Sequence, residues 1–226
     1  MKIYFSLFAL ILMNYVGHAQ REIVVELKSF TEIKAFDRIR TVLIKSNENK
    51  VVITGDDQDD VNVSVKSGLL KIKMDFENQM DGGDVTATVY HTEPFTLIDA
   101  NENAEITSDD TILGTEVKLA AQEGGKITLK VDIEDLYVKS TSGAAITLTG
   151  KVRKQEVVAN AGGKVWNEDL STTETKVTVN AGGTARVHAT DKMEAKVRAG
   201  GSIYVYGNPK DLKRDKIFGG KIKVMD

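Results

Sequence analysis

Four carboxylates crowd one short stretch of the chain, Gly55 to Asp60, which reads GDDQDD. Carboxylate oxygens are the ligands that Ca²⁺ prefers in proteins. The spacing differs from that of an EF-hand loop, and the calcium-binding nonapeptide repeat is absent from the sequence. We interpret the stretch as a solvated acidic turn, with a calcium site as the open alternative, and its acidic residues are Asp56, Asp57, Asp59 and Asp60.

Other metal-binding and nucleophilic side chains are sparse. The chain contains no cysteine, which excludes thiolate metal sites, cysteine nucleophiles and disulfides. Beyond the first 19 residues the histidines are His91 and His188, which stand far apart in the sequence. The sequence therefore predicts no metal site of this kind, no cofactor and no catalytic residue.

A paired glycine recurs in phrases such as VNAGGTARVHA, Val179 to Ala189, and VRAGGSIYVYG, Val197 to Gly207. A glycine-rich turn can cradle a phosphate, but such a loop occurs once and leads from a strand into a helix. Here the motif returns many times and alternating, strand-like residues follow it. The glycines are therefore predicted to form corners, where they permit positive φ and let neighbouring corners stack without a Cβ clash.

The corners recur at intervals of 18 to 21 residues. Three and five residues after each corner stands a mostly apolar side chain, whereas the residue between them is mostly polar. This alternation predicts short strands with one buried face. The corners begin at Asn103, Gly124, Gly143, Gly162, Gly182, Gly200 and Gly219, and the first inward position after each is Ile106, Ile127, Ile146, Val165, Ala185, Ile203 and Ile222.

A unit of about 19 residues with two short strands can bury its inner face only by stacking on copies of itself. The sequence therefore predicts an all-β protein, a single right-handed parallel β-helix. Right-handed winding is expected because parallel crossover connections are overwhelmingly right-handed. Residues 100–226 should form the regular coils. Residues 20–99 should form a less regular, strand-rich cap of the same domain, with a tight hairpin turn at Ser67 and Gly68.

Residues 1–19 have the features of a secretory signal peptide. Lys2 precedes the apolar run IYFSLFALILM, and Gly17 and Ala19 suit cleavage after Ala19. No later segment is long and apolar enough to span a membrane as a helix. We therefore expect an exported protein, located in the periplasm, on the outer cell surface or in the medium.

An enzyme that cleaves polysaccharides would need two carboxyl groups about 5–9.5 Å apart, which in a β-helix means adjacent coils at matching offsets. The positions seven to nine residues after successive corners hold Asp132, Lys151, Asp169 and Asp191. Because a lysine interrupts the acids and their offsets differ, no acidic ladder emerges. A polysaccharide lyase or hydrolase remains only the alternative prediction.

Aromatic side chains offer a binding surface instead. Tyr90, Trp166, Tyr204 and Tyr206 could stack on sugar rings. Trp166 and Tyr204 share the outward position after their corners, and Arg186 holds that position on the coil between them. The sequence therefore predicts a continuous surface strip made of Trp166, Arg186 and Tyr204.

Three features carry a resemblance to a known family. They are the run SFTEIKAFDRIRTVLIKSNENKVVITGDDQDDVNVSVKSGLLKIKM, the serial AGG corners, and the closing YVYGNPKDLKRDKIFGGKIKV. Together they resemble the exported bacterial proteins called putative auto-transporter adhesins with a head GIN domain, a family common in Bacteroidetes. The resemblance implies a β-helical fold and an adhesin role, and it supplies no catalytic or binding residues.

The predicted function is that of a non-catalytic, adhesin-like or structural protein of the cell envelope. Its rigid face would meet a glycan, an envelope or extracellular protein, or another copy of itself as a homo-oligomer. The net charge of −3 argues against nucleic acid as a partner.

Overall fold

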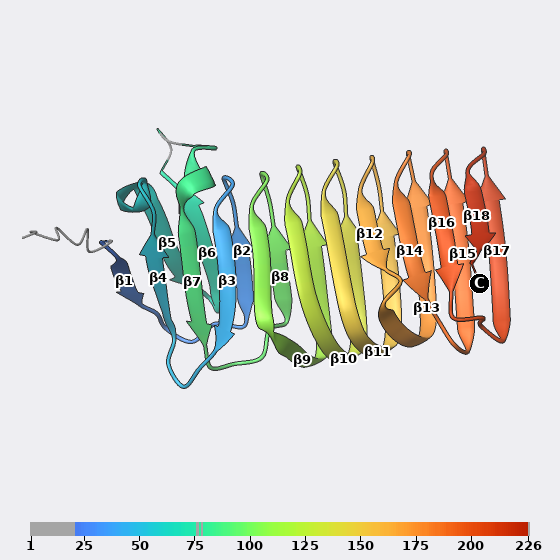
Figure 1. Cartoon of the computed structure of the whole chain (residues 1–226), viewed down its shortest axis with the longest axis horizontal. Coiled ribbons are helices and arrows are strands. Elements are labelled where there is room, and N and C mark those ends of the chain that lie inside the picture. Colours follow the sequence, from blue (N-terminus) through green and yellow to red (C-terminus); the bar gives the residue numbers. More distant parts are fainter. Residues whose placement is uncertain (1–20, 76, 78, 226) are drawn as a thin grey trace, which may run out of the picture.

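The computed structural model describes residues 21–75, 77 and 79–225, so the predicted signal peptide lies outside the described residues. Figure 1 shows strands standing side by side along one axis, with tight turns along one edge. The strands are β1 (Ile23–Glu26), β2 (Glu32–Ala35), β3 (Arg40–Lys45), β4 (Lys50–Thr54), β5 (Val61–Lys66), β6 (Leu69–Met74), β7 (Thr86–His91), β8 (Leu97–Ala100), β9 (Glu105–Ala121), β10 (Lys126–Ser140), β11 (Ala145–Ala159), β12 (Lys164–Asn167), β13 (Leu170–Asn180), β14 (Thr184–His188), β15 (Lys192–Arg198), β16 (Ser202–Tyr206), β17 (Asp211–Ile217) and β18 (Lys221–Val224). Two 3₁₀ turns, η1 (Gln58–Asp60) and η3 (Gly82–Asp84), lie between strands.

The predicted parallel β-helix is confirmed, with about seven turns of roughly 19 residues. Each coil contributes one strand to each of two facing sheets. We call the sheet whose strands follow the corners the leading sheet; it includes β12, β14, β16, β18 and the first halves of β9 to β11. The sheet whose strands precede the corners is the trailing sheet; it includes β15, β17, most of β13 and the second halves of β9 to β11.

Parallel pairing keeps equivalent residues directly beside one another from coil to coil. Ile127 pairs with Ile146, Ile146 with Val165, and Val165 with Ala185. All four side chains are at most 1% exposed, so the predicted inward column is confirmed. Fully burying such an aliphatic side chain contributes about 1.5–3 kcal/mol. The stacked columns therefore supply the hydrophobic core that the chain needs in the absence of disulfides.

The corners are turns in which both central residues have positive φ, as in a type I′ turn. At one of them φ is 46° for Ala181 and 78° for Gly182. A Cβ on Gly182 would meet nothing within 4 Å, so the predicted clash between neighbouring corners is wrong for this glycine. The clash arises one residue later, because a Cβ on Gly183 would lie 2.6 Å from the Ala159 carbonyl oxygen. The first glycine thus allows the positive φ of the turn, and the second allows the backbones of neighbouring coils to approach closely.

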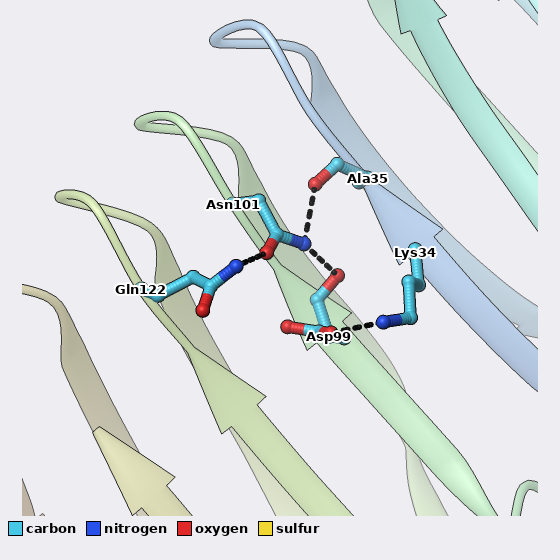
Figure 2. A network of polar contacts seen from close by, with 5 residues as sticks. All are labelled: Lys34, Ala35, Asp99, Asn101 and Gln122. Carbon is cyan, nitrogen blue, oxygen red and sulfur yellow. Dashed lines mark hydrogen bonds and ion pairs between the residues drawn. The ribbon is translucent and has the colours of Figure 1, made fainter. Parts of the chain in front are cut away.

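Amide side chains also link the corners of neighbouring coils. Figure 2 shows Gln122 Nε2 donating to Asn101 Oδ1 at 2.5 Å, while Asn101 Nδ2 donates to the Ala35 carbonyl oxygen at 3.4 Å. Nearby, Lys34 pairs with the buried carboxylate of Asp99 at 2.9 Å. These bonds satisfy polar groups that the stacking removes from water.

The first coils are not stacked in chain order. β2 pairs in parallel with β6 on one side and β8 on the other, and β3 lies between β7 and β9. The coil formed by β2 and β3 is therefore enclosed between coils that come later in the sequence. Beyond it, antiparallel strands cover the N-terminal end of both sheets: β4 on β7, β1 on β4, and β5 on β6. The turn between β5 and β6 is the predicted hairpin, with φ of 50° at Ser67 and 78° at Gly68.

Ile146→Asp should destabilise the protein by several kcal/mol, because it buries an unpaired charge at a site that is 0% exposed. Thr147→Asp, on the outer side of the same strand, should change the free energy of unfolding by less than about 1 kcal/mol. Thermal and urea unfolding of the two variants measure the difference. Equal melting temperatures would show that the inward and outward assignments are wrong.

Substitutions at the corner glycines should also differ in their effect on stability. Gly182→Val should lower stability by about 1–2 kcal/mol, because a β-branched residue is strained at positive φ. Gly183→Val should also destabilise, through the clash with the Ala159 carbonyl. Gly182→Asn is the control, since Asn103 holds the equivalent position with φ of 61°. If the asparagine variant melts as early as Gly182→Val, the conformational argument fails.

Candidate functional site

The predicted strip is continuous in the structure. β12 carries Trp166, β14 carries Arg186 and β16 carries Tyr204, and the parallel register places each residue directly beside the next. Adjacent strands lie about 4.8 Å apart, so the three side chains form one patch on the outer surface of the leading sheet. We refer to these three residues as the aromatic strip.

Contacts hold Arg186 in place between the two rings. Its guanidinium carbon lies 4.6 Å from the centroid of the Trp166 ring, within cation–π range. Its Nη1 donates to Glu168 Oε1 at 2.8 Å, and this hydrogen bond raises the pKa of Arg186 above its ordinary value. On the next coil, Lys221 Nζ lies 5.5 Å from the centroid of Tyr204. The strip is therefore ordered by its own neighbours.

Three further residues belong to this surface and were not predicted as part of the strip. His188 and Tyr206 pair in the register of β14 and β16, in the column adjoining the strip. Glu168, just beyond β12, accepts the hydrogen bond from Arg186. The sequence carried a signal for Tyr206, because a residue two positions after Tyr204 on the same strand faces the same way. The sequence carried no such signal for Glu168, because β12 ends at Asn167 and the alternation of a strand does not extend to the next residue.

The other aromatic candidate lies apart from the strip. Tyr90 is on β7, several coils away on the leading sheet, where Lys50 Nζ lies 5.0 Å from its ring centroid. The two histidines are separated in the same way, since His91 is on β7 and His188 on β14. His91 is 4% exposed and packs on Phe95, and its burial lowers its pKa. His91 is thus a core residue.

The acidic stretch lies at the N-terminal end of the solenoid. It connects β4 to β5 through η1, and its Asp59 forms an ion pair with Arg21 at 3.0 Å. Among the described residues no group of three or more histidine, aspartate or glutamate side chains is arranged to hold a metal ion. Asp56 and Asp59 remain exposed.

Two of the three acids that follow the corners are paired with lysines. Asp132 lies 3.2 Å from Lys151 Nζ, and Asp191 lies 2.6 Å from Lys210 Nζ, in each case on the following coil. Asp169 is exposed near the end of β12. The structure thus places each of two candidate acids beside a cation.

A family model for the putative auto-transporter adhesin, head GIN domain, matches residues 29–209. The chain belongs to this family. The match covers most of the leading and trailing sheets, including all three residues of the aromatic strip. A search of curated proteins finds no significant match.

Several solved structures share the fold. A putative adhesin from Bacteroides fragilis superposes with a TM-score of 0.84 at 18% identity, covering 92% of this chain and 98% of that one. A putative adhesin from Parabacteroides distasonis gives 0.68 at 19% identity, with coverages of 91% and 96%. A putative lipid binding protein from the same species gives 0.69 at 15%, with 92% and 98%. At these identities the likeness concerns the fold alone. No helix among the described residues is long and apolar enough to cross a membrane.

Trp166 is the single tryptophan of the chain, so its fluorescence reports on the strip alone. Arg186→Ala removes the guanidinium that covers the indole ring. We expect emission at longer wavelength and faster quenching by acrylamide, with an unchanged melting temperature. Lys154→Ala, an exposed change on the trailing sheet, is the control. Identical quenching in the Arg186 variant and the wild type would contradict the stacked geometry.

Proposed function

We propose that the protein is a non-catalytic, adhesin-like module of the cell envelope, and that the aromatic strip is its contact surface for a glycan or an envelope protein. The family to which the chain belongs fits a non-catalytic binding role at the cell exterior. The proposal adds the surface that would perform this role.

The ordered arrangement of Trp166, Arg186 and Tyr204 is the observation that carries the proposal. The exposed parts of the Trp166 and Tyr204 rings, beside the cations that lie over them, offer apolar surface against which a sugar ring or an apolar side chain can pack. A guanidinium offers several fixed donors for hydroxyl or carboxylate oxygens. Because Glu168 and Trp166 already hold Arg186, little conformational entropy is lost when a ligand binds.

A polysaccharide-cleaving enzyme is the weaker alternative. Such chemistry requires one carboxyl group as an acid and another as a base or nucleophile. Asp132 and Asp191 each lie against a lysine of the next coil instead. The paired acids support a structural role, in which they tie one coil to the next.

A binding screen with glycans and matrix proteins, followed by titration of the best ligand, tests the proposal. Trp166→Ala and Tyr204→Ala should each weaken binding by roughly tenfold or more, as for truncated aromatic anchors at other interfaces. Tyr137→Ala is the matched control. Tyr137 is a partly exposed tyrosine of the trailing sheet with a lysine over its ring, as Tyr204 is on the leading sheet.

The control variant should bind as the wild type does. A ligand whose affinity falls equally with Tyr137→Ala and Tyr204→Ala would place binding elsewhere. Turnover of a polysaccharide by the purified protein would overturn the non-catalytic assignment.

A further inference from the structure

The outer surface of the leading sheet has an unusual charge distribution. We call this surface the leading face and define it by its outward side chains from β10 to β18. In order along the axis these are Lys126, Thr128, Lys130, Ala145, Thr147, Thr149, Lys164, Trp166, Glu168, Thr184, Arg186, His188, Ser202, Tyr204, Tyr206, Lys221 and Lys223.

Basic residues dominate this face although the whole chain is acidic. The leading face carries five lysines and one arginine against a single acid, Glu168, whereas the chain has a net charge of −3. Glu168 is already paired with Arg186 at 2.8 Å. No ion pair between described residues involves the five lysines of the face, and all five are exposed. Their charges are therefore free to attract a ligand.

The opposite surface also carries basic groups, but acids accompany them. On the trailing sheet, the outward positions of the same coils hold six lysines, Arg198 and six acids, and many of them pair across coils. Lys176 meets Glu156 at 3.0 Å, and Lys196 meets Asp215 at 2.8 Å. A groove of about 660 Å³ on this surface is lined by such alternating charges. The surplus of positive charge is thus concentrated on the leading face.

We propose that the leading face binds an anionic polysaccharide, one that carries carboxylate or sulfate groups, lying along the axis of the solenoid. This inference rests on the proposed function and names the ligand class of the same surface. Sugar rings would pack against the exposed parts of Trp166 and Tyr204, and the lysines would meet the acidic groups. Hydroxyl groups of Thr147, Thr184 and Ser202, among others, would exchange hydrogen bonds with the sugar hydroxyls.

The spacing of the lysines favours a polymer that is less densely charged than duplex DNA. Lys126, Lys164 and Lys221 share one column, two and three coils apart. At about 4.8 Å per coil these intervals are roughly 10 and 14 Å. Duplex DNA carries one charge per roughly 1.7 Å, so it would leave most of its phosphates unmatched against an acidic protein.

The leading face also lacks the features of a lipid-inserting surface. Its Trp166, Tyr204 and Tyr206 rings are partly buried rather than projecting. The large apolar side chains exposed among the described residues are Val24, Leu113 and Phe218, and none belongs to this face. Stacking and charge pairing, rather than insertion, are the interactions that this surface offers.

Binding of five probes to the purified protein tests the proposal. The probes are polygalacturonate, dextran sulfate with few sulfates per chain, unmodified dextran, single-stranded poly-dT and vesicles of phosphatidylglycerol, each titrated at low and moderate salt. Polygalacturonate or dextran sulfate should bind most tightly, and whichever does identifies carboxylate or sulfate as the preferred group. Affinity should fall as salt rises.

Two matched charge reversals locate the binding. Lys164→Glu should weaken binding of the anionic polysaccharide by roughly tenfold and lower the salt dependence by about one counterion. Lys154→Glu should leave the affinity within about twofold, by the same reasoning, because it lies on the trailing sheet. Both lysines are exposed, lie on adjacent coils and form no ion pair with a described residue. Circular dichroism confirms that both variants remain folded.

The other outcomes each overturn one specific claim. Equal losses with Lys164→Glu and Lys154→Glu would show that the leading face is not the site. Tighter binding of poly-dT or vesicles would show that the ligand is not a polysaccharide. If neutral glycans bind in a Trp166-dependent manner and Lys164→Glu has no effect, the anionic class is wrong while the proposed function stands. If the wild type binds no glycan and no matrix protein, the proposed function itself fails.

Discussion

The regular coils of this molecule depend on parallel pairing that is kept in register from one coil to the next. The corners maintain that register: the Gly143 N–H donates to the Ala161 carbonyl oxygen, and the Gly162 N–H donates to that of Ala181, both at 3.2 Å. Once the corners are aligned, residues at the same distance in sequence from each corner point inward on every coil, because side chains alternate between the two faces of a strand. The hydrophobic core and the outer surface are thus two consequences of one hydrogen-bonded ladder.

The same ladder lets the two outer surfaces differ without affecting the core. A change at an outward position alters a single column and its immediate neighbours, so charge can accumulate on one sheet and be neutralised on the other.

Inward positions tolerate fewer changes of residue type. Asn167 stands in a column otherwise filled by residues such as Leu148 and Val187, is 0% exposed, and has no hydrogen-bond partner among the described residues for either amide atom. A buried amide of this kind costs stability unless it is satisfied. The core can therefore accommodate few buried polar side chains that lack hydrogen-bond partners.

The regular coils could be predicted from the sequence because they repeat. Seven similar corners align the apolar positions, and that alignment alone puts Trp166, Arg186 and Tyr204 on adjacent coils. The N-terminal coils could not be placed in the same way, since alternation in β2 and β3 identifies strands but not their partners. Whether β3 pairs with β4 or with β9 depends on long-range packing, which cannot be predicted from the periodicity of the sequence. The role of Gly183 was also hidden, because its need for close approach arises from the Ala159 carbonyl on another coil.

The position of the β2–β3 coil has a consequence for how the protein is assembled. Thr41 pairs with Ile106, so the third strand to be synthesised acquires its second neighbour only after some sixty-five further residues have followed. From β10 onward each coil can dock on its finished predecessor, as in an ordinary repeat protein. The first coils cannot dock in this way. Their strands pair with strands much later in the sequence, so the entropy of closing a long loop is lost before the stabilising contacts form. The order of synthesis therefore differs from the spatial order of the coils at this end, and we expect the insertion of the earliest strands between later ones to be slow.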